Sequence, residues 1–159
     1  MKVLNVHSRV IDKPAKEVAT IFDHLATEND LVWPHRKWPP MRFREGVKVG
    51  AKGGHGPVRY TIEKFVPGKM IEFRFSRPRG FHGVHRLELT ALNSDTSELV
   101  HAIDMEIRGL GIITWHLIIR PLHDALLEDA LDQAENHFVG SNKTTPWDLW
   151  VRILRFVLK

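Results

Sequence analysis

The sequence predicts an α+β domain in which a long C-terminal helix lies across the concave face of a curved antiparallel sheet. Apolar and polar residues alternate with a period of two between Val58 and Ile107, which is the pattern of strands. From about Ile112 to Phe138 the apolar period becomes helical. One strand and one or two short helices precede this region. The helices are therefore segregated from most of the strands, as in the α+β class.

The composition is that of one globular domain. The chain has 159 residues, of which 43% are hydrophobic and 26% are charged. A net charge of +4 slightly favours acidic ligands or anionic surfaces. The chain contains no cysteine, which excludes disulfides and thiolate chemistry and fits a reducing compartment. The N-terminus lacks the pattern of a signal peptide and no apolar stretch is long enough to span a membrane, so we expect a cytoplasmic protein.

Residues 2–25 predict a strand followed by helix. Asp12 and Pro14 indicate a helix start, and apolar residues recur at helical spacing as far as Leu25. We therefore expect one or two short helices there. Before them, side chains alternate as in a half-buried strand, with Leu4, Val6, Ser8 and Val10 on one side and Asn5, His7 and Arg9 on the other.

The segment VWPHRKWPPMRF, residues 32–43, predicts an irregular loop, because proline removes a backbone donor and restricts the residue before it. Two interpretations of Trp33 and Trp38 stay open. They cap the mouth of a ligand cavity beside Arg36 and Lys37, or they fill a gap in the core. The next stretch, EGVKVGAKGGHGP, predicts turns and a short edge strand.

The central region predicts hairpins with a definite register. Val66-Pro67-Gly68-Lys69 fits a type II turn, which would pair Ile62 with Phe73 and Tyr60 with Phe75 on one face. Two further strands are expected over residues 82–92 and 97–107. Their inward sets are His85, Leu87, Leu89 and Ala91 on the first, and Leu99, His101, Ile103, Met105 and Ile107 on the second.

The long helix is expected to be amphipathic, kinked or broken near Arg120 by Pro121, and ended by Gly140. Its spacing places Asp124, Glu128, Asp132 and Glu135 on one face. The opposite, inner face is expected to carry Ile112, Trp115, His116, Ile119, His123, Leu126, Ala130, Ala134 and His137.

These elements resemble the START-like, helix-grip (SRPBCC) superfamily, which includes polyketide cyclases/dehydrases, lipid-transfer domains and plant pathogenesis-related proteins. The resemblance covers residues 2–138. It is carried by the segments DKPAKEVATIFDHL, RYTIEKFVPGKMIEFRF and PLHDALLEDALDQAENHF. It implies a sheet of about six or seven strands wrapped around the helix, and a hydrophobic or amphipathic small ligand in the cavity between them. It does not decide between carriage and catalysis.

Histidines provide the candidate polar groups of that cavity. The catalytic candidates are His85, His101, His116 and His123, because imidazoles suit proton transfer near neutral pH. The alternative is that His85 and His101 are core residues with local hydrogen bonds. The full set of candidate ligand contacts is Trp33, Trp38, Tyr60, Phe73, Phe75, His85, Leu87, His101, Ile103, Trp115, Ile119 and His123.

No metal or cofactor is expected from the sequence. The histidines do not follow a metal-ligand spacing, and no carboxylate falls on the expected inner helix face. Nucleic acid is not an expected partner either, because the cations are scattered and no recognised motif is present.

Residues 141–159 are interpreted as a C-terminal amphipathic extension to a domain of residues 1–140. Thr145 and Pro146 predict a helix start. The helix is mostly apolar, and a narrow polar stripe follows Asp148, Arg152, Arg155 and Lys159. It is too short to span a bilayer. We expect the apolar face of residues 144–159 to pack on its own domain, on a second copy in a homodimer, or on a membrane surface.

Three functions stay open from the sequence. The first is binding, and possible transport, of a hydrophobic or amphipathic small molecule. The second is an aromatase/cyclase or dehydratase-type enzyme that uses the cavity histidines for acid–base chemistry. The third is a protein-interaction module that uses residues 32–43, here called the Trp loop, and the apolar tail of residues 144–159.

Overall fold

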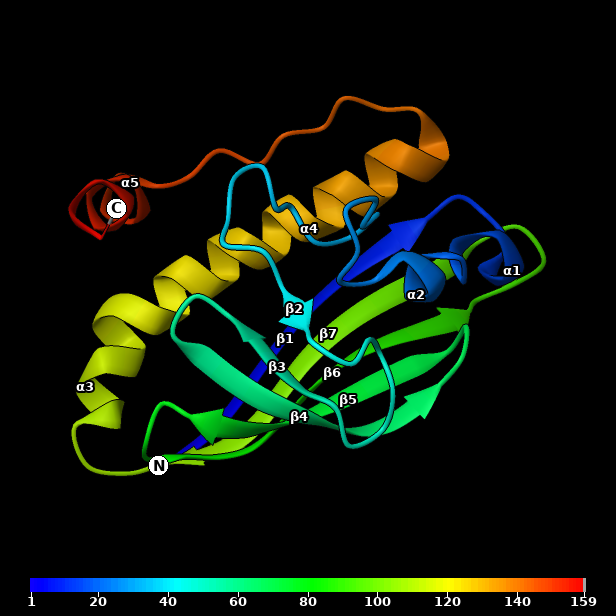
Figure 1. Cartoon of the computed structure of the whole chain (residues 1–159). Coiled ribbons are helices and arrows are strands. Elements are labelled where there is room, and N and C mark those ends of the chain that lie inside the picture. Colours follow the sequence, from blue (N-terminus) through cyan, green and yellow to red (C-terminus); the bar gives the residue numbers. More distant parts are fainter. Residues whose placement is uncertain (159) are drawn as a thin grey trace.

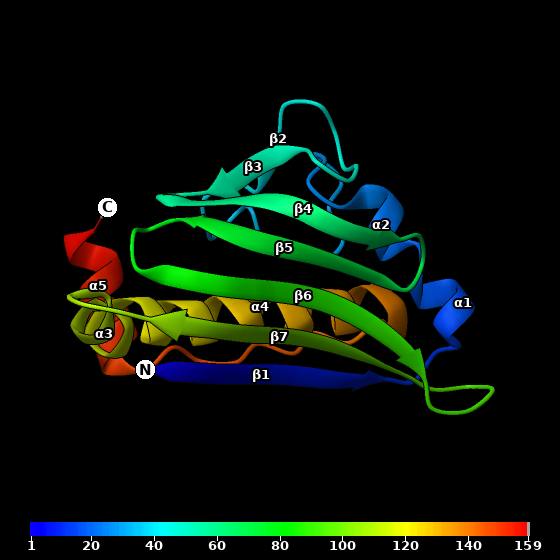
Figure 2. The same cartoon turned by 90° about the horizontal axis from the view of Figure 1, so that it is seen from below.

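A seven-stranded antiparallel sheet curves around the long helix α4 in the computed structural model, which describes residues 1–158 (Figures 1 and 2). The strands lie in the order β1-β7-β6-β5-β4-β3-β2. Their bounds are β1 Lys2–Ile11, β2 Arg42–Phe43, β3 Lys52–His55, β4 Val58–Val66, β5 Met70–Arg77, β6 Phe81–Ala91 and β7 Ser97–Ile107. The expected α+β architecture is confirmed.

Short helices follow β1, and a long helical run follows β7. The short helices are α1 Ala15–Val18 and α2 Ile21–His24, and the long run consists of α3 Gly111–Thr114, η1 Trp115–Ile119 and α4 Arg120–Val139. The η1 segment is a π-helical turn, and Pro121 lies in the first turn of α4 directly after it. A wider turn at this point accommodates a residue that has no amide hydrogen to donate. Gly140 ends α4 with a positive φ of 73°, as expected.

The expected hairpin register is confirmed. Ile62 lies opposite Phe73 and Tyr60 lies opposite Phe75 across the β4–β5 hairpin. The turn closes with a hydrogen bond of 3.0 Å from the Lys69 amide to the Val66 carbonyl. The predicted inward residues of β6 and β7 are buried except Ala91, which is exposed at the end of β6. The buried ones are His85, Leu87, Leu89, Leu99, His101, Ile103, Met105 and Ile107. The concave face of the sheet therefore carries both the core and the interior histidines.

The strand β1 turns its polar side inward. Leu4 is 69% exposed and Val6 is 53% exposed on the outer side, whereas Asn5 is buried. β1 packs against α4, and its inward side chains meet acidic residues of that helix. Alternation alone defines two sides of a strand, and here the charge of the facing helix decides which side is covered.

Two expectations about the helix faces are wrong. His116 and His137 are exposed and do not face the sheet. The π-helical turn shifts the register of His116 relative to α4, and Phe138 takes the inward position at the end of the helix. The second is the expectation that no carboxylate falls on the inner face, because β1, the Trp loop and the C-terminal segment enclose several acidic residues of α4. Asp129 and Asp132 are buried, and Asp124 approaches the inward-facing His123.

The C-terminal helix α5, Leu149–Val157, packs against α4 and lies at the same end of the molecule as α3 (Figure 2). It begins later than expected, because the Asp148 side chain accepts a hydrogen bond of 2.7 Å from the Val151 amide and caps it. Lys159 of the expected polar stripe lies outside the described residues. Among residues 1–158, every helix is either too short or too polar to cross a membrane.

Candidate functional site

A continuous run of aromatic and imidazole rings crosses the interior between the sheet and α4. His85 on β6 is its centre, with Phe73 and Phe75 stacked on its ring at centroid distances of 4.7 and 4.8 Å. Tyr60 meets the same imidazole edge-on at 4.8 Å. His101 on β7 continues the run at 5.4 Å from His85. The aromatic residues and the histidines that were expected to line the ligand cavity therefore lie together.

His85 and His101 form a hydrogen-bonded imidazole pair. The Nδ1 atom of His85 lies 3.3 Å from the Nε2 atom of His101, so one nitrogen donates and the other accepts, according to the tautomers. The outer nitrogens, His85 Nε2 and His101 Nδ1, are enclosed and have no protein partner. Burial lowers the pKa of both imidazoles well below the ordinary value, so both rings are neutral near neutral pH.

One end of the run is formed by Trp33, His55 and Tyr60. The Nδ1 atom of His55 lies 3.1 Å from the Tyr60 hydroxyl, and the Trp33 ring lies against His55 at 4.6 Å. Burial lowers the pKa of His55 to about 3 and raises the pKa of the Tyr60 hydroxyl. His55 was missed by the sequence reasoning, because GGHG was interpreted only as turn-forming glycine.

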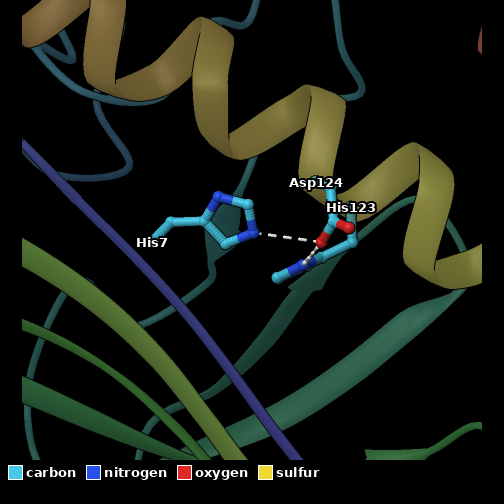
Figure 3. A group of neighbouring side chains, drawn as sticks. All are labelled: His7, His123 and Asp124. Atoms are coloured by element: carbon cyan, nitrogen blue, oxygen red, sulfur yellow. Dashed lines mark hydrogen bonds and ion pairs between the residues drawn. The ribbon is translucent and has the colours of Figure 1, made fainter. Parts of the chain in front are cut away.

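The other end of the run is formed by His123, His7 and Asp124, shown in Figure 3. The His123 ring on α4 lies 5.2 Å from that of His101 and 6.3 Å from that of His7 on β1. The Nε2 atom of His7 is 3.0 Å from Asp124 Oδ1. The Nδ1 atom of His123 is enclosed, has no hydrogen-bond partner and lies 3.7 Å from the same carboxylate oxygen.

Opposing effects set the protonation of this end. The hydrogen bond to Asp124 raises the pKa of His7 above its ordinary value, although burial opposes the charged form. Burial lowers the pKa of His123. Burial also disfavours the Asp124 carboxylate, but its hydrogen-bonding neighbours, including His7 and Asn5, outweigh that effect and hold its pKa below the ordinary range.

His7 is the second residue that the sequence reasoning missed. It lies on the polar side of β1 beside Arg9, which binds Asp132 at 2.8 Å and Glu128 at 3.0 Å and also contacts Glu135. A signal was present in the sequence. The cations of β1 complement the acidic face of the helix, and their pairing would have placed His7 between sheet and helix.

Several of the expected ligand contacts lie in or beside the run of rings. Trp115 packs against Phe81 and lies 6.3 Å from the ring of His123. The others in the interior are Tyr60, Phe73, Phe75, His85, Leu87, His101, Ile103 and Ile119, of which Phe75 and Ile119 are half-buried.

Trp38 lies elsewhere. Its indole donates a hydrogen bond of 2.8 Å to Asp129, and its ring lies 5.5 Å from that of Trp147. It therefore joins the Trp loop to α4 and the C-terminal segment.

Two surface pockets adjoin this interior. The first, of ≈ 300 Å³, lies between α2, β2 and the end of β4, where Phe22, Phe43 and Phe65 line it. Phe43 separates this pocket from the run of rings, because its ring stacks on Phe73 at 5.9 Å and contacts Tyr60 at 5.8 Å. The second, of ≈ 480 Å³, lies between α4 and the C-terminal segment, and its lining includes Asp124, Glu128 and Trp147.

Comparison with solved structures identifies the architecture. Norcoclaurine synthase from Thalictrum flavum superposes with a TM-score of 0.67 at 9% identity, over 89% of this chain and 88% of that one. The chain has the START-like, helix-grip fold.

Two further helix-grip structures agree. The Zhui aromatase/cyclase from a Streptomyces species gives a TM-score of 0.60 at 15% identity, over 86% of this chain and 96% of that one. A START superfamily protein from Mycobacterium smegmatis gives 0.56 at 12% identity, over 86% and 97%. Comparison of the sequence with known protein families and with curated proteins finds no match. These likenesses describe the helix-grip fold and not an activity.

Proposed function

We propose that this protein binds a small amphipathic molecule between α4 and the concave face of the sheet, with its polar group on the interior histidines. One observation carries the proposal. His85 Nε2, His101 Nδ1 and His123 Nδ1 are enclosed and unpartnered along one run of rings. Each unpaired buried polar atom destabilises the fold by about 1–3 kcal/mol. A ligand that supplied the missing hydrogen bonds would recover part of that free energy.

The surroundings indicate the kind of ligand. If His85 donates to His101, the free nitrogen of His85 is an acceptor and the free nitrogen of His101 is a donor. A hydroxyl or carbonyl group suits such a pair, and the stacked Phe73 and Phe75 suit a ring or an acyl chain. Norcoclaurine synthase, which shares the fold, was solved in complex with dopamine and hydroxybenzaldehyde, both aromatic compounds with polar groups.

Entry to this interior requires movement at its edge. Phe43 lies between the interior rings and the pocket beside α2. Glycine at position 53 allows the Phe43 ring to lie here, because a Cβ atom there would lie 2.3 Å from the Arg42 carbonyl oxygen and 2.4 Å from the Phe43 ring. We propose that the ligand enters from the pocket beside α2 when Phe43 turns aside.

The test compares two probes that differ by one hydroxyl group, 2-naphthol and naphthalene, in titration calorimetry of the full chain. We expect 2-naphthol to bind about tenfold more tightly, which corresponds to one hydrogen bond of about 1.4 kcal/mol. His101→Leu should remove the preference, and the exposed control His137→Leu should keep it. Equal binding of both probes, or a preference that survives His101→Leu, would contradict the proposal. Native mass spectrometry of the purified protein should identify any retained ligand.

The enzymatic alternative rests on the same histidines. Both members of the His85–His101 pair are neutral because burial lowers their pKa, and the neutral imidazole is the form that accepts a proton. In an aromatase/cyclase or dehydratase-type reaction, His101→Gln or His123→Gln would lower turnover while the fold is kept. If ligand binding is unchanged and both variants only melt at a lower temperature, the histidines are core residues.

The exposed side of α5 is a candidate surface for contact with a second partner. Ile153 and Phe156 are 43% and 81% exposed, and the Trp150 indole donates a hydrogen bond of 2.7 Å to Leu117 beside them. Contact of this surface with a membrane or with a second copy of the chain remains a proposal. Sedimentation with and without anionic vesicles separates the two, because vesicle binding should weaken with salt.

A further inference from the structure

Three electron-pair donors converge where β1 passes α4. His7 Nε2, His123 Nδ1 and Asp124 Oδ1 all lie within 4.8 Å of one another, and the three side chains point to a common centre in Figure 3. In a tetrahedral site, metal–ligand bonds of about 2.1 Å hold the ligand atoms about 3.4 Å apart. The distances from Asp124 Oδ1 are 3.0 Å to His7 and 3.7 Å to His123, so small side-chain movements suffice to surround an ion.

A second carboxylate supports His7 from behind. Glu128 Oε1 lies 2.9 Å from His7 Nδ1, and the other oxygen of Glu128 binds Arg9 at 3.0 Å. Metal-binding histidines commonly donate their distal N–H to such a carboxylate, which fixes the tautomer and directs the free nitrogen to the ion. With the proton on Nδ1, the bare Nε2 faces a carboxylate oxygen. His7 Nε2 and Asp124 Oδ1 are then both acceptors only 3.0 Å apart, so a cation or a second proton has to lie between them.

Buried polar atoms without partners surround the same point. His123 Nδ1 is one, and Asn5 Oδ1 is another. Asn5 is 8% exposed, and its amide nitrogen donates to Asp124 Oδ1 at 3.0 Å. The two ends of an asparagine amide are alike in shape, so rotation by 180° would direct its oxygen to the same centre. A cation there would give His123 Nδ1 a partner, which a proton on His7 does not.

Two carboxylates of this group also reach the surface. Asp124 and Glu128 line the pocket of ≈ 480 Å³ between α4 and the C-terminal segment. On its inner side, His123 contacts His101 and so adjoins the interior run of rings. An ion at this position would lie between that surface pocket and the interior rings.

We propose that His7, His123 and Asp124 bind a divalent transition-metal ion of the zinc, cobalt or iron(II) class, with Asn5 as an additional oxygen ligand and Glu128 supporting His7. Imidazole and carboxylate ligands together suit this class of ion. Three strong protein ligands with Asn5 as a fourth complete the four-coordinate geometry that zinc prefers. No ligand spacing in the sequence indicates the site, because its donors come from β1 and from α4, 117 residues further along the chain.

The experiment uses the full chain, stripped with EDTA and then freed of chelator. Titration calorimetry with Zn²⁺ should show one saturable site of about micromolar affinity or tighter. Co²⁺ should give visible absorption bands of nitrogen and oxygen ligation. Absence of saturable Zn²⁺ binding to the wild type would overturn the proposal and leave His7 as a protonated ion-pair partner of Asp124 and Glu128.

Variants locate the site. We expect His7→Gln and His123→Gln each to weaken Zn²⁺ binding at least 100-fold, and Glu128→Gln to weaken it 10- to 100-fold. The matched controls are His116→Gln and His137→Gln, which remove exposed histidines and should bind as the wild type does. Loss of binding in these controls but not in His7→Gln would show an adventitious surface site. If His7→Gln fails to fold, the wild-type titration and Glu128→Gln still decide the proposal.

Discussion

Asp129 is a single buried carboxylate that joins three parts of the chain. Its oxygens accept hydrogen bonds from the indoles of Trp38 at 2.8 Å and Trp147 at 2.9 Å, and from the Lys37 ammonium at 2.5 Å. The Arg155 guanidinium lies 4.3 Å from the centroid of the Trp38 ring. The two tryptophans that the Trp loop and the tail contribute are therefore held by one acidic residue of α4.

Asp129→Asn should lower the free energy of unfolding by about 3 kcal/mol, because the amide loses the charge and one of the acceptor positions in a buried cluster. Urea denaturation followed by tryptophan fluorescence measures the change. Asp95→Asn in the exposed β6–β7 turn is the matched control and should stay within about 0.5 kcal/mol of the wild type. A wild-type midpoint for Asp129→Asn would mean that this cluster does not contribute to stability.

At the scale of the element, α5 has one covered side and one exposed side. Val151 and Leu154 are buried against the domain, whereas Leu149, Phe156 and Val157 are each at least 69% exposed. Packing on its own domain therefore accounts for only part of the apolar surface of the helix.

Leu154→Ala should lower the free energy of unfolding by about 2–4 kcal/mol, as for other buried leucines. Phe156→Ala should change it by less than about 0.5 kcal/mol, because 81% of that side chain is already exposed. Thermal and urea unfolding of the two variants give the comparison. Equal effects would show that both sides of α5 are covered in the native particle.

Elements were more predictable from the sequence than their contacts. Period-two alternation predicted the bounds of β7, because that signal is local. The predicted pairs Ile62–Phe73 and Tyr60–Phe75 are present, but the turn alone does not set them, because Val66 pairs with Met70 and a bulge between Ile62 and Lys64 shifts the register by one residue. The inward side of β1 and the outward position of His116 depend on a facing helix and on a π-helical turn. His101 could be placed at the site because its neighbours on the strand are apolar. His7 could not, because its partners are distant in sequence.

At the scale of the whole molecule, interior histidines make stability depend on pH. Burial lowers the folded pKa of His85 below the unfolded value of about 6.5. Above pH 6.5 the imidazole is neutral in both the folded and the unfolded state, and the stability is complete. As the pH falls below 6.5, only the unfolded chain takes up the proton, so the folded state loses stability. His7 acts in the opposite sense, since its raised pKa contributes stability below pH 6.5 that is lost as the pH rises through the folded value.

His85→Leu should therefore flatten the decline of stability between pH 6 and 5 by about 1.4 kcal/mol per pH unit. Urea midpoints measured at several pH values in the presence of EDTA give the slope without interference from metal ions. His137→Leu, which removes an exposed histidine, should leave the slope unchanged. A slope in His85→Leu that matches the wild type would show that His85 is accessible to protons in the folded state.

The cluster at Asp129 also has a consequence for communication across the molecule. Because one carboxylate holds both the Trp loop and the tail, release of either segment weakens the attachment of the other. By thermodynamic reciprocity, a molecule that displaces the loop loosens α5 by the same coupling free energy with which an α5-bound partner loosens the loop. Trp33, which covers His55, belongs to that loop, so a partner that draws α5 and Trp147 away from Asp129 would alter the affinity of the interior without touching it.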